Sequence, residues 1–318
     1  MEKNSSSVQL PPVQRAKAKP RRMQSAAVNS SLIRRPIQRC FALFLLPTFI
    51  AFCIGFLYPF LKGVHLSFCK FRTTSDAQWI GLANYIKALK DPGFLHAFWY
   101  TALVAVTSLV LINVLAFAVA YALTRGIRGA NIYRSVFFMP NLIGGIVLGY
   151  IWSIIYATLL PQSVLLNTTY GFWGLIVLMC WQQIGYMMII YIAGIQSVSE
   201  DMLEAAKIDG ANGWHTLTRI IIPTVMPSIT ICTFLSLTNG FKLFEQNLAL
   251  NGVGQPIAIQ GGMQIRTTEM LALNIYNTFY LNANSRGVGQ AKAVLFFVLV
   301  AAIALIQLRA THSKEVQQ

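Results

Sequence analysis

Residues 98–124 read FWYTALVAVTSLVLINVLAFAVAYALT, a run of 27 residues without a charged side chain. An α-helix rises about 1.5 Å per residue, so about 20 apolar residues cross the roughly 30 Å hydrocarbon core of a bilayer. This run is long enough for that purpose and too apolar for an ordinary surface helix. It predicts a membrane-spanning helix.

Five further stretches of the chain have the same character. The chain is 55% hydrophobic and 11% charged, whereas soluble domains carry about 25% charged residues. Backbone groups inside lipid must be hydrogen-bonded within their own segment, so long apolar blocks indicate helices. The short alternating segments of a membrane β-barrel are absent from the sequence. We therefore predict an all-α membrane protein with six transmembrane helices, at approximately 41–61, 98–124, 133–159, 171–196, 221–244 and 288–308.

The net charge of +15 is concentrated near the N-terminus. A cluster of basic residues precedes the first block: Lys3, Arg15, Lys17, Lys19, Arg21, Arg22, Arg34, Arg35 and Arg39. Arg125, Arg128 and Arg134 follow the second block. We expect the protein in the bacterial cell (inner) membrane. Positive segments stay on the cytoplasmic side, so a chain with six spans has both termini in the cytoplasm. Contact with anionic lipid explains this charge better than nucleic-acid binding.

The domain organisation follows from these blocks. Residues 1–39 form a polar, basic cytoplasmic tail whose composition predicts disorder, residues 40–310 form the six-span domain, and residues 311–318 form a second cytoplasmic tail. The first block is too long for the apolar region of a signal peptide. The outer loops 62–97 and 245–287 are long, and a structureless loop of that length is functional or disordered. The five cysteines include no C-x-x-C pair, so neither a disulfide framework nor a metal site is expected.

The inner segment between the fourth and fifth blocks is unlike every other loop. It contains four of the ten acidic residues: Glu200, Asp201, Glu204 and Asp209. Residues 202–207 are good helix formers, the pair Asp209-Gly210 breaks the helix, and Asn212 is positioned to cap a second short helix. Trp214, Leu217, Thr218 and Ile221 then follow at helical spacing. This helix–Gly–helix either folds against its own membrane domain or docks onto a partner, in which case Glu204 offers a carboxylate to an arginine.

The residues of this segment resemble a known motif. Glu204-Ala205-Ala206-Lys207-Ile208-Asp209-Gly210-Ala211, followed by Ile222-Pro223, is similar to the "EAA" loop of binding-protein-dependent ABC permeases. The resemblance covers most of residues 40–310 and is closest to sugar permeases of the maltose and glycerol-phosphate type. One departure is Val198-Ser199, where that family has Ile-Pro. The supporting motifs are Leu46-Pro47, Tyr58-Pro59, Leu66-Ser67-Phe68, Gly81-Leu82-Ala83-Asn84-Tyr85, Arg134-Ser135-Val136-Phe137-Phe138-Met139-Pro140 and Ala193-Gly194-Ile195-Gln196-Ser197.

The resemblance implies partners and a mechanism. A second permease subunit would complete the pathway as a heterodimer, an extracellular or periplasmic sugar-binding protein would deliver the cargo, and a cytoplasmic ATPase dimer would bind ATP and Mg²⁺. The coupling (EAA) loop between spans 4 and 5 would insert into the ATPase, with Glu204 near an arginine. The chain has no G-x-x-x-x-G-K-[ST] phosphate loop, so it is expected to be a permease without enzymatic activity or a cofactor of its own. The coupling residues implied are Glu204, Ala205, Ala206, Asp209, Gly210 and Trp214.

Uncharged polar residues within the spans are candidates for substrate contact: Asn113, Asn141, Gln182, Tyr186 and Asn239. Such residues also form hydrogen bonds between helices, so both interpretations stay open for each. The first four spans have no central charge, which favours a neutral substrate over an ion or proton relay. The alternatives are an ABC permease for a non-sugar solute, a secondary transporter, which needs an intramembrane ionisable residue, and a membrane-embedded enzyme.

Overall fold

A computed structural model describes residues 45–160, 167–251, 255–260 and 262–312. It divides into two units, Met1–Pro59 and Phe60–Gln318. The predicted tail at 1–39 and residues 313–318 lie outside the described residues. In the first unit residues 45–59 are helical, with a π-helical turn, η1, at Cys53–Leu57. Its apolar side chains Phe49 and Ile54 are exposed. This is expected of a helix whose surface faces lipid.

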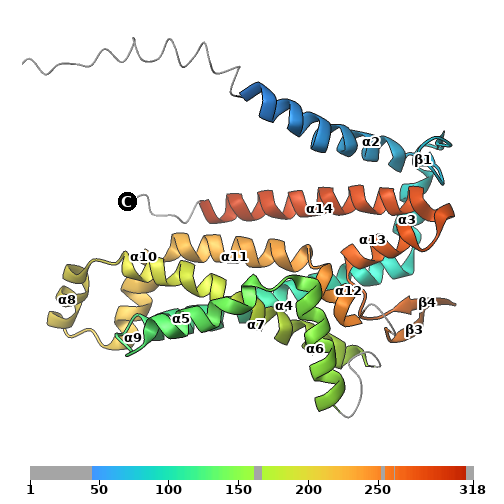
Figure 1. Cartoon of the computed structure of the whole chain (residues 1–318). Coiled ribbons are helices and arrows are strands. Elements are labelled where there is room, and N and C mark those ends of the chain that lie inside the picture. Colours follow the sequence, from blue (N-terminus) through green and yellow to red (C-terminus); the bar gives the residue numbers. More distant parts are fainter. Residues whose placement is uncertain (1–44, 161–166, 252–254, 261, 313–318) are drawn as a thin grey trace, which may run out of the picture. The chain divides into compact units, whose positions relative to one another are not determined.

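The helical run that begins in the first unit ends with α2 (Tyr58–Ser67). Three long helices dominate the second unit, namely α4 (Pro92–Leu123), α7 (Thr168–Gln196) and α14 (Arg286–His312). The shorter helix α11 (Met226–Phe241) packs against all three. α4 packs along α7 and α11 (Figure 1). α7 is the most deeply buried of the long spanning helices, and α4 presents the small residues Ala116 and Ala120 to the core, which lets helices approach closely in lipid.

Two of the predicted spans are bent helix pairs. The block 133–159 consists of α5 (Ala130–Phe138), the 3₁₀ turn η2 (Met139–Leu142) and α6 (Gly145–Leu159), with a bend of 100°. The block 221–244 begins within the helical segment Gly213–Thr224, which meets α11 at 70°. Prolines explain both breaks, because Pro140, Pro223 and Pro227 donate no backbone N–H. Among the described residues four helices are long and apolar enough to cross a membrane, namely Leu45–Ser67, Pro92–Leu123, Thr168–Gln196 and Ala283–Gln307. The number reaches the expected six if each bent pair is one span.

The connections at one end of the second unit are also structured. After α2, strands β1 (Cys69–Lys70) and β2 (Gln78–Trp79) pair antiparallel, and α3 (Ala83–Lys90) follows. The segment 245–287 was expected to be a long loop, and that expectation is wrong. It contains α12 (Glu245–Asn251), a hairpin of β3 (Ile257–Gln260) and β4 (Met263–Arg266), α13 (Leu271–Tyr280) and the turn η4 (Ala283–Ser285).

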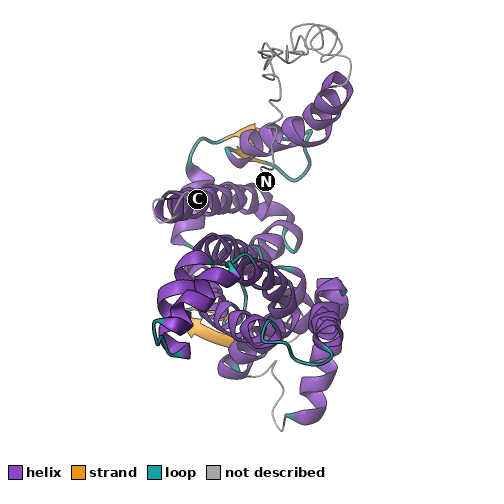
Figure 2. Cartoon of the chain, turned by 90° about the vertical axis from the view of Figure 1, so that its left-hand side faces the viewer, coloured by secondary structure: helices purple, strands orange, loops and turns teal. Residues whose placement is uncertain are grey.

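The opposite end of the second unit contains the Gly-interrupted segment. α8 (Glu200–Ile208) and α9 (Gly213–Thr216) flank the break, and the π-helical turn η3 (Leu217–Ile221) and α10 (Ile222–Thr224) lead into α11. In Figure 1, α8 and α9 lie at one end of the helices, and the β3–β4 hairpin lies at the other. Figure 2, turned by 90°, shows the long helices of this unit nearly along their axes.

A buried lysine ties three helices together at the hairpin end. Lys292 of α14 is 1% exposed, and its Nζ donates to Asp91 Oδ2 at 2.7 Å, Asn274 Oδ1 at 2.8 Å and Thr278 Oγ1 at 2.8 Å. Asp91 also caps α4 by accepting a hydrogen bond from the Gly93 N–H. The ammonium group is therefore fully hydrogen-bonded, which a buried charge requires.

The crossing of α5 over α7 depends on Gly185. A Cβ atom at this position would lie 1.9 Å from the Phe137 carbonyl oxygen and 2.3 Å from its carbon. We predict that Gly185→Ala destabilises the protein by about 1–3 kcal/mol, because backbone has to move to admit the methyl group. The measurement is thermal unfolding in mild detergent.

Gly213→Ala is the matched control for this prediction, because nothing lies within 4 Å of a Cβ atom at Gly213. Equal melting temperatures for the two variants would contradict the packing of α5 on α7 at Gly185.

Candidate functional site

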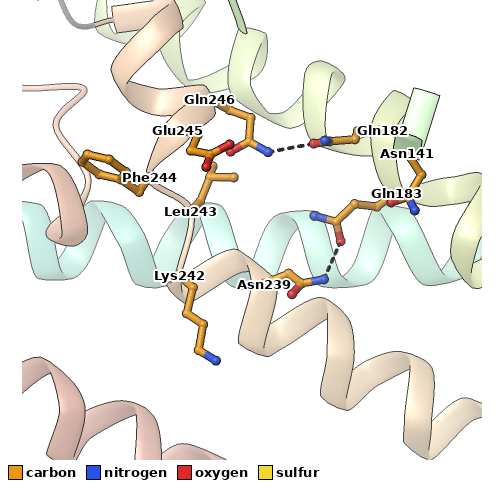
Figure 3. Close-up of a pocket in the computed structure, with 9 residues that line it drawn as sticks. All are labelled: Asn141, Gln182, Gln183, Asn239, Lys242, Leu243, Phe244, Glu245 and Gln246. Carbon is orange, nitrogen blue, oxygen red and sulfur yellow. Dashed lines mark hydrogen bonds between the residues drawn. The ribbon is translucent and has the colours of Figure 1, made fainter. Parts of the chain in front are cut away.

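A polar pocket of about 360 Å³ lies within the second unit (Figure 3). Its lining residues are Asn141, Gln182, Gln183, Asn239, Lys242, Leu243, Phe244, Glu245 and Gln246. Five of the nine are carboxamides, and each carboxamide offers both hydrogen-bond donors and an acceptor. This mixture suits a ligand that carries many hydroxyl groups.

The pocket forms where helices are interrupted. Asn141 belongs to η2, just before the bend between α5 and α6, while Asn239 lies near the end of α11. Leu243 and Phe244 form the link between α11 and α12. Non-helical backbone at membrane depth is tolerated where it lines a cavity or is covered by protein. One carbonyl freed by the first bend, that of Ile143, accepts a hydrogen bond from Gln182 Nε2 at 3.4 Å.

Hydrogen bonds between side chains connect the walls of the pocket. Gln246 Nε2 donates to Gln182 Oε1 at 2.8 Å, and Asn239 Nδ2 donates to Gln183 Oε1 at 3.5 Å (Figure 3). Gln182 and Gln183 are both buried. Lys242 extends its amine away from the amides in Figure 3, whereas the Glu245 carboxylate lies beside Gln246. The site therefore combines five carboxamides with one carboxylate.

Helices α6 and α12 pack together beside the pocket. Gly145 and Gly149 of α6 are one turn apart, and a Cβ atom at Gly149 would lie 2.7 Å from Ala249 Cβ of α12. A Cβ atom at Gly145 would lie 2.7 Å from Glu245 Oε2. This close approach places Gln246 of α12 against Gln182 of α7.

The structure brings three of the five candidate substrate residues together. Asn141, Gln182 and Asn239 line the pocket. Tyr186 lies one turn beyond Gln182 on α7, is 37% exposed and does not line it. Its role stays a prediction.

Asn113 occupies a different place, between α4, α7 and α11. Its Nδ2 donates to Leu109 O at 2.7 Å and to Ser236 Oγ at 3.0 Å, and its Oδ1 accepts from the Tyr191 hydroxyl at 2.7 Å. These bonds fit the second interpretation of a polar residue within a span, which is that it forms hydrogen bonds between helices.

Gln246 is a pocket residue that sequence reasoning missed. The segment was assigned to an outer loop, so its side chain was not considered at membrane depth. The sequence signal for a structured element here was the short pattern EQNLALN at 245–251. In this pattern the apolar residues Leu248 and Leu250 lie among polar ones.

The first half of the helix–Gly–helix segment has the expected geometry. α8 ends at Ile208, and Gly210 adopts φ +77°, a left-handed conformation that favours glycine. Glu204, Ala205 and Asp209 are exposed, whereas Ala206 is buried. Within the described ranges the Glu204 carboxylate has no hydrogen-bond or ion-pair partner.

The second half of the segment differs from the expected single apolar face. The π-helical turn η3 at Leu217–Ile221 shifts the helical register. As a result Ile221 is buried, whereas Trp214 is 68% exposed. Ile208 is 87% exposed and Met202 46%, so the segment leaves three large apolar side chains uncovered.

A second cavity, of about 510 Å³, lies between the two halves of this segment. Ala205, Ala206, Asp209 and Gly210 line it together with Met202, Ala211, His215, Arg219 and Ile220. The loop is therefore concave on one side, with exposed apolar groups nearby.

Asn212 caps α9, because its side-chain oxygen accepts a hydrogen bond from the His215 N–H at 2.8 Å. We predict that Asn212→Ala destabilises this short helix by about 1 kcal/mol, whereas Asn212→Asp preserves it. Amide hydrogen exchange at residues 213–216 measures the effect. Equal exchange in both variants would contradict a stabilising cap.

Comparison with known proteins gives a consistent result. The family described as "Binding-protein-dependent transport system inner membrane component" matches residues 116–311. The "Probable starch degradation products transport system permease protein AmyD" of Thermoanaerobacterium thermosulfurigenes is 39% identical over 287 residues, which cover 86% of this chain and 94% of that protein. The "sn-glycerol-3-phosphate transport system permease protein UgpA" of Brucella abortus is 28% identical, covering 83% of this chain and 92% of that protein.

A solved structure has the same fold. The chain matches a protein from the "Crystal structure of a bacterial ABC transporter involved in the import of the acidic polysaccharide alginate" with a TM-score of 0.73. The alignment covers 88% of this chain and 98% of that one, at 20% sequence identity.

Proposed function

The chain belongs to the family of binding-protein-dependent transport system inner membrane components, and we propose that it is the permease subunit of an ABC importer that moves a sugar or oligosaccharide into the cell. A separate ATPase subunit drives the movement, and an extracellular binding protein delivers the cargo. The observation that carries this proposal is the group of five carboxamides that line one pocket among otherwise apolar helices.

The chemistry of the pocket supports a neutral, hydroxyl-rich cargo. Carboxamides exchange hydrogen bonds with hydroxyl groups in both directions, and the relatives include a permease named for starch degradation products. The transport route passes Asn141, Gln182 and Asn239, with Tyr186 one turn away. Asn113 serves as a structural bond between helices in this proposal.

In the proposed topology each bent helix pair is one span, so the membrane domain of residues 40–310 has six. The tails 1–39 and 311–318 lie in the cytoplasm of a bacterial cell. α8 and α9 then face the cytoplasm, and the β3–β4 hairpin lies outside. The basic residues that precede the first span and those of the 125–134 loop support this orientation.

The coupling loop is the proposed contact with the ATPase. Glu204, Ala205, Ala206, Asp209, Gly210 and Trp214 would form it, and a second permease subunit with its own loop would complete the complex. The uncovered Ile208 and Trp214 and the unpaired Glu204 carboxylate support docking onto a partner. The sequence contains no phosphate-loop motif, so ATP and Mg²⁺ would be bound by the ATPase chain.

A phosphate ester is the second candidate cargo. Lys242 lines the pocket, and one relative is named for sn-glycerol-3-phosphate transport. Lys242→Gln distinguishes the two cargo classes. It should leave uptake of a neutral sugar within about twofold, but it should lower uptake of a phosphate ester about tenfold, because a charged hydrogen bond is lost.

Glu204→Arg tests the coupling loop. We expect the ATPase to be lost from the purified complex while the second permease is retained, because the substitution places a positive charge where a partner arginine is proposed. The measurement is the ratio of ATPase to permease after affinity purification in mild detergent. Glu200→Arg is the matched control, with the same charge change in the first turn of the same helix. Normal ATPase retention by Glu204→Arg would remove Glu204 from the docking site.

Gln182→Ala and Tyr186→Ala test the transport route. We expect both to slow uptake in an assembled complex, Gln182→Ala by about three- to tenfold, because a neutral hydrogen bond contributes about 1 kcal/mol. Initial uptake rates in vesicles measure this. Gln196→Ala, at the end of α7 and outside the pocket, should be unchanged. An unchanged rate for Gln182→Ala would leave that residue a structural role only.

A further inference from the structure

A third cavity, of about 280 Å³, is lined only by leucine and phenylalanine side chains. The lining residues are Leu89, Phe94, Leu95, Phe98, Leu271, Leu295, Phe296 and Leu299. They come from the last turn of α3, the first two turns of α4, the start of α13 and the middle of α14. The cavity shares no residue with the polar pocket.

The cavity has a closed floor and an open rim. Phe94 and Leu271 are buried in a small core cluster of their own. Leu89 and Leu95 are 53% and 45% exposed, so the cavity opens outward between them.

The opening continues into the apolar outer face of α4. Leu95 lines the cavity and is also the first member of a row of exposed apolar side chains: Leu95, Trp99, Leu103, Val106, Val110 and Val114. A membrane-spanning helix turns such a face toward lipid, and an exposed tryptophan near its end is typical of the membrane interface. The cavity is therefore continuous with the lipid-facing surface.

Two lysines neighbour the cavity residue Leu89 along the chain. Lys87 and Lys90 are exposed in the last turn of α3, the same turn that contributes Leu89. The neighbouring carboxylate, Asp91, is bound to Lys292 Nζ at 2.7 Å, which neutralises much of its charge. An anionic headgroup would therefore meet two lysines and a compensated acid.

From these observations we infer that the cavity is a binding site for an anionic phospholipid. One acyl chain occupies the Leu/Phe cavity, and the phosphate group lies against Lys87 and Lys90. The inference rests on the chain being a membrane protein and is independent of the cargo.

The lining favours an acyl chain over a helix of another subunit. Helix interfaces in membranes are enriched in glycine, alanine and serine, which allow close backbone approach. None of these small residues lines the cavity. A flexible acyl chain fits between bulky side chains without such an approach and leaves no polar group unpaired.

The test is photo-crosslinking of the whole transporter. Leu95 is replaced by benzoylphenylalanine, and the complex is reconstituted in phosphatidylcholine vesicles that contain a minor fraction of phosphatidylglycerol. Leu103 on the same exposed face, outside the cavity, receives the same replacement as the control. Mass spectrometry then identifies what each position has captured.

We expect the lipid adducts at Leu95 to be enriched about fivefold in phosphatidylglycerol relative to those at Leu103. In the double variant Lys87→Gln/Lys90→Gln this enrichment should disappear. The same lipid ratio at both positions would mean that only the bulk bilayer is sampled, and would overturn the inference. A cross-link from Leu95 to another protein chain would overturn it as well.

A second measurement keeps the inference testable if the Leu95 replacement fails to assemble. Leu295→Trp fills the cavity, and native mass spectrometry should then find at least one phosphatidylglycerol fewer per chain than in Leu305→Trp, an exposed position on the same helix. Equal retention in the two variants would contradict the site.

Discussion

The structure depends on one constraint: within lipid, every backbone N–H and C=O must be hydrogen-bonded by the protein itself. Long, uninterrupted helices meet it in α4, α7 and α14. Where the chain departs from a helix, at Ile143–Gly144 and at Lys242–Phe244, the departures meet around one cavity. Carboxamides there can bind each other, freed backbone groups such as Ile143 O, or a ligand. The same interruptions that create the bends therefore create the pocket.

Elements that depend on neighbouring residues could be predicted from the sequence, whereas elements that depend on contacts between distant residues could not. The blocks 98–124, 171–196 and 288–308 correspond to α4, α7 and α14 within a few residues, because an apolar run without charges decides a span locally. The bend in 133–159 was not predicted, since apolar content stays high on both sides of Pro140 and gives no sign of direction. α12 was missed for a related reason: its helical form depends on packing against Gly145 and Gly149, which are distant in sequence.

The candidate site shows the same division. Asn141, Gln182 and Asn239 could be selected by residue type within apolar blocks, but Gln246 joins them only through the packing of α12 on α6. Asn113 has the same residue type and a different environment, between α4, α7 and α11. In the helix–Gly–helix segment the Asn212 cap is a local interaction and was predicted correctly. The π-helical turn at Leu217–Ile221 was not, because helical spacing alone gives no indication of an inserted residue.

The central claim is that an ATPase bound to this chain, and not an ion gradient, drives a neutral sugar across the membrane. The most direct test uses the complex purified from its native membrane, reconstituted in vesicles with its binding protein and the sugar that the binding protein retains. The account predicts uptake that requires ATP on the side of the coupling loop and is unaffected when proton and sodium gradients are abolished. Uptake that proceeds without ATP and stops when those gradients are removed would contradict it and identify a secondary transporter instead.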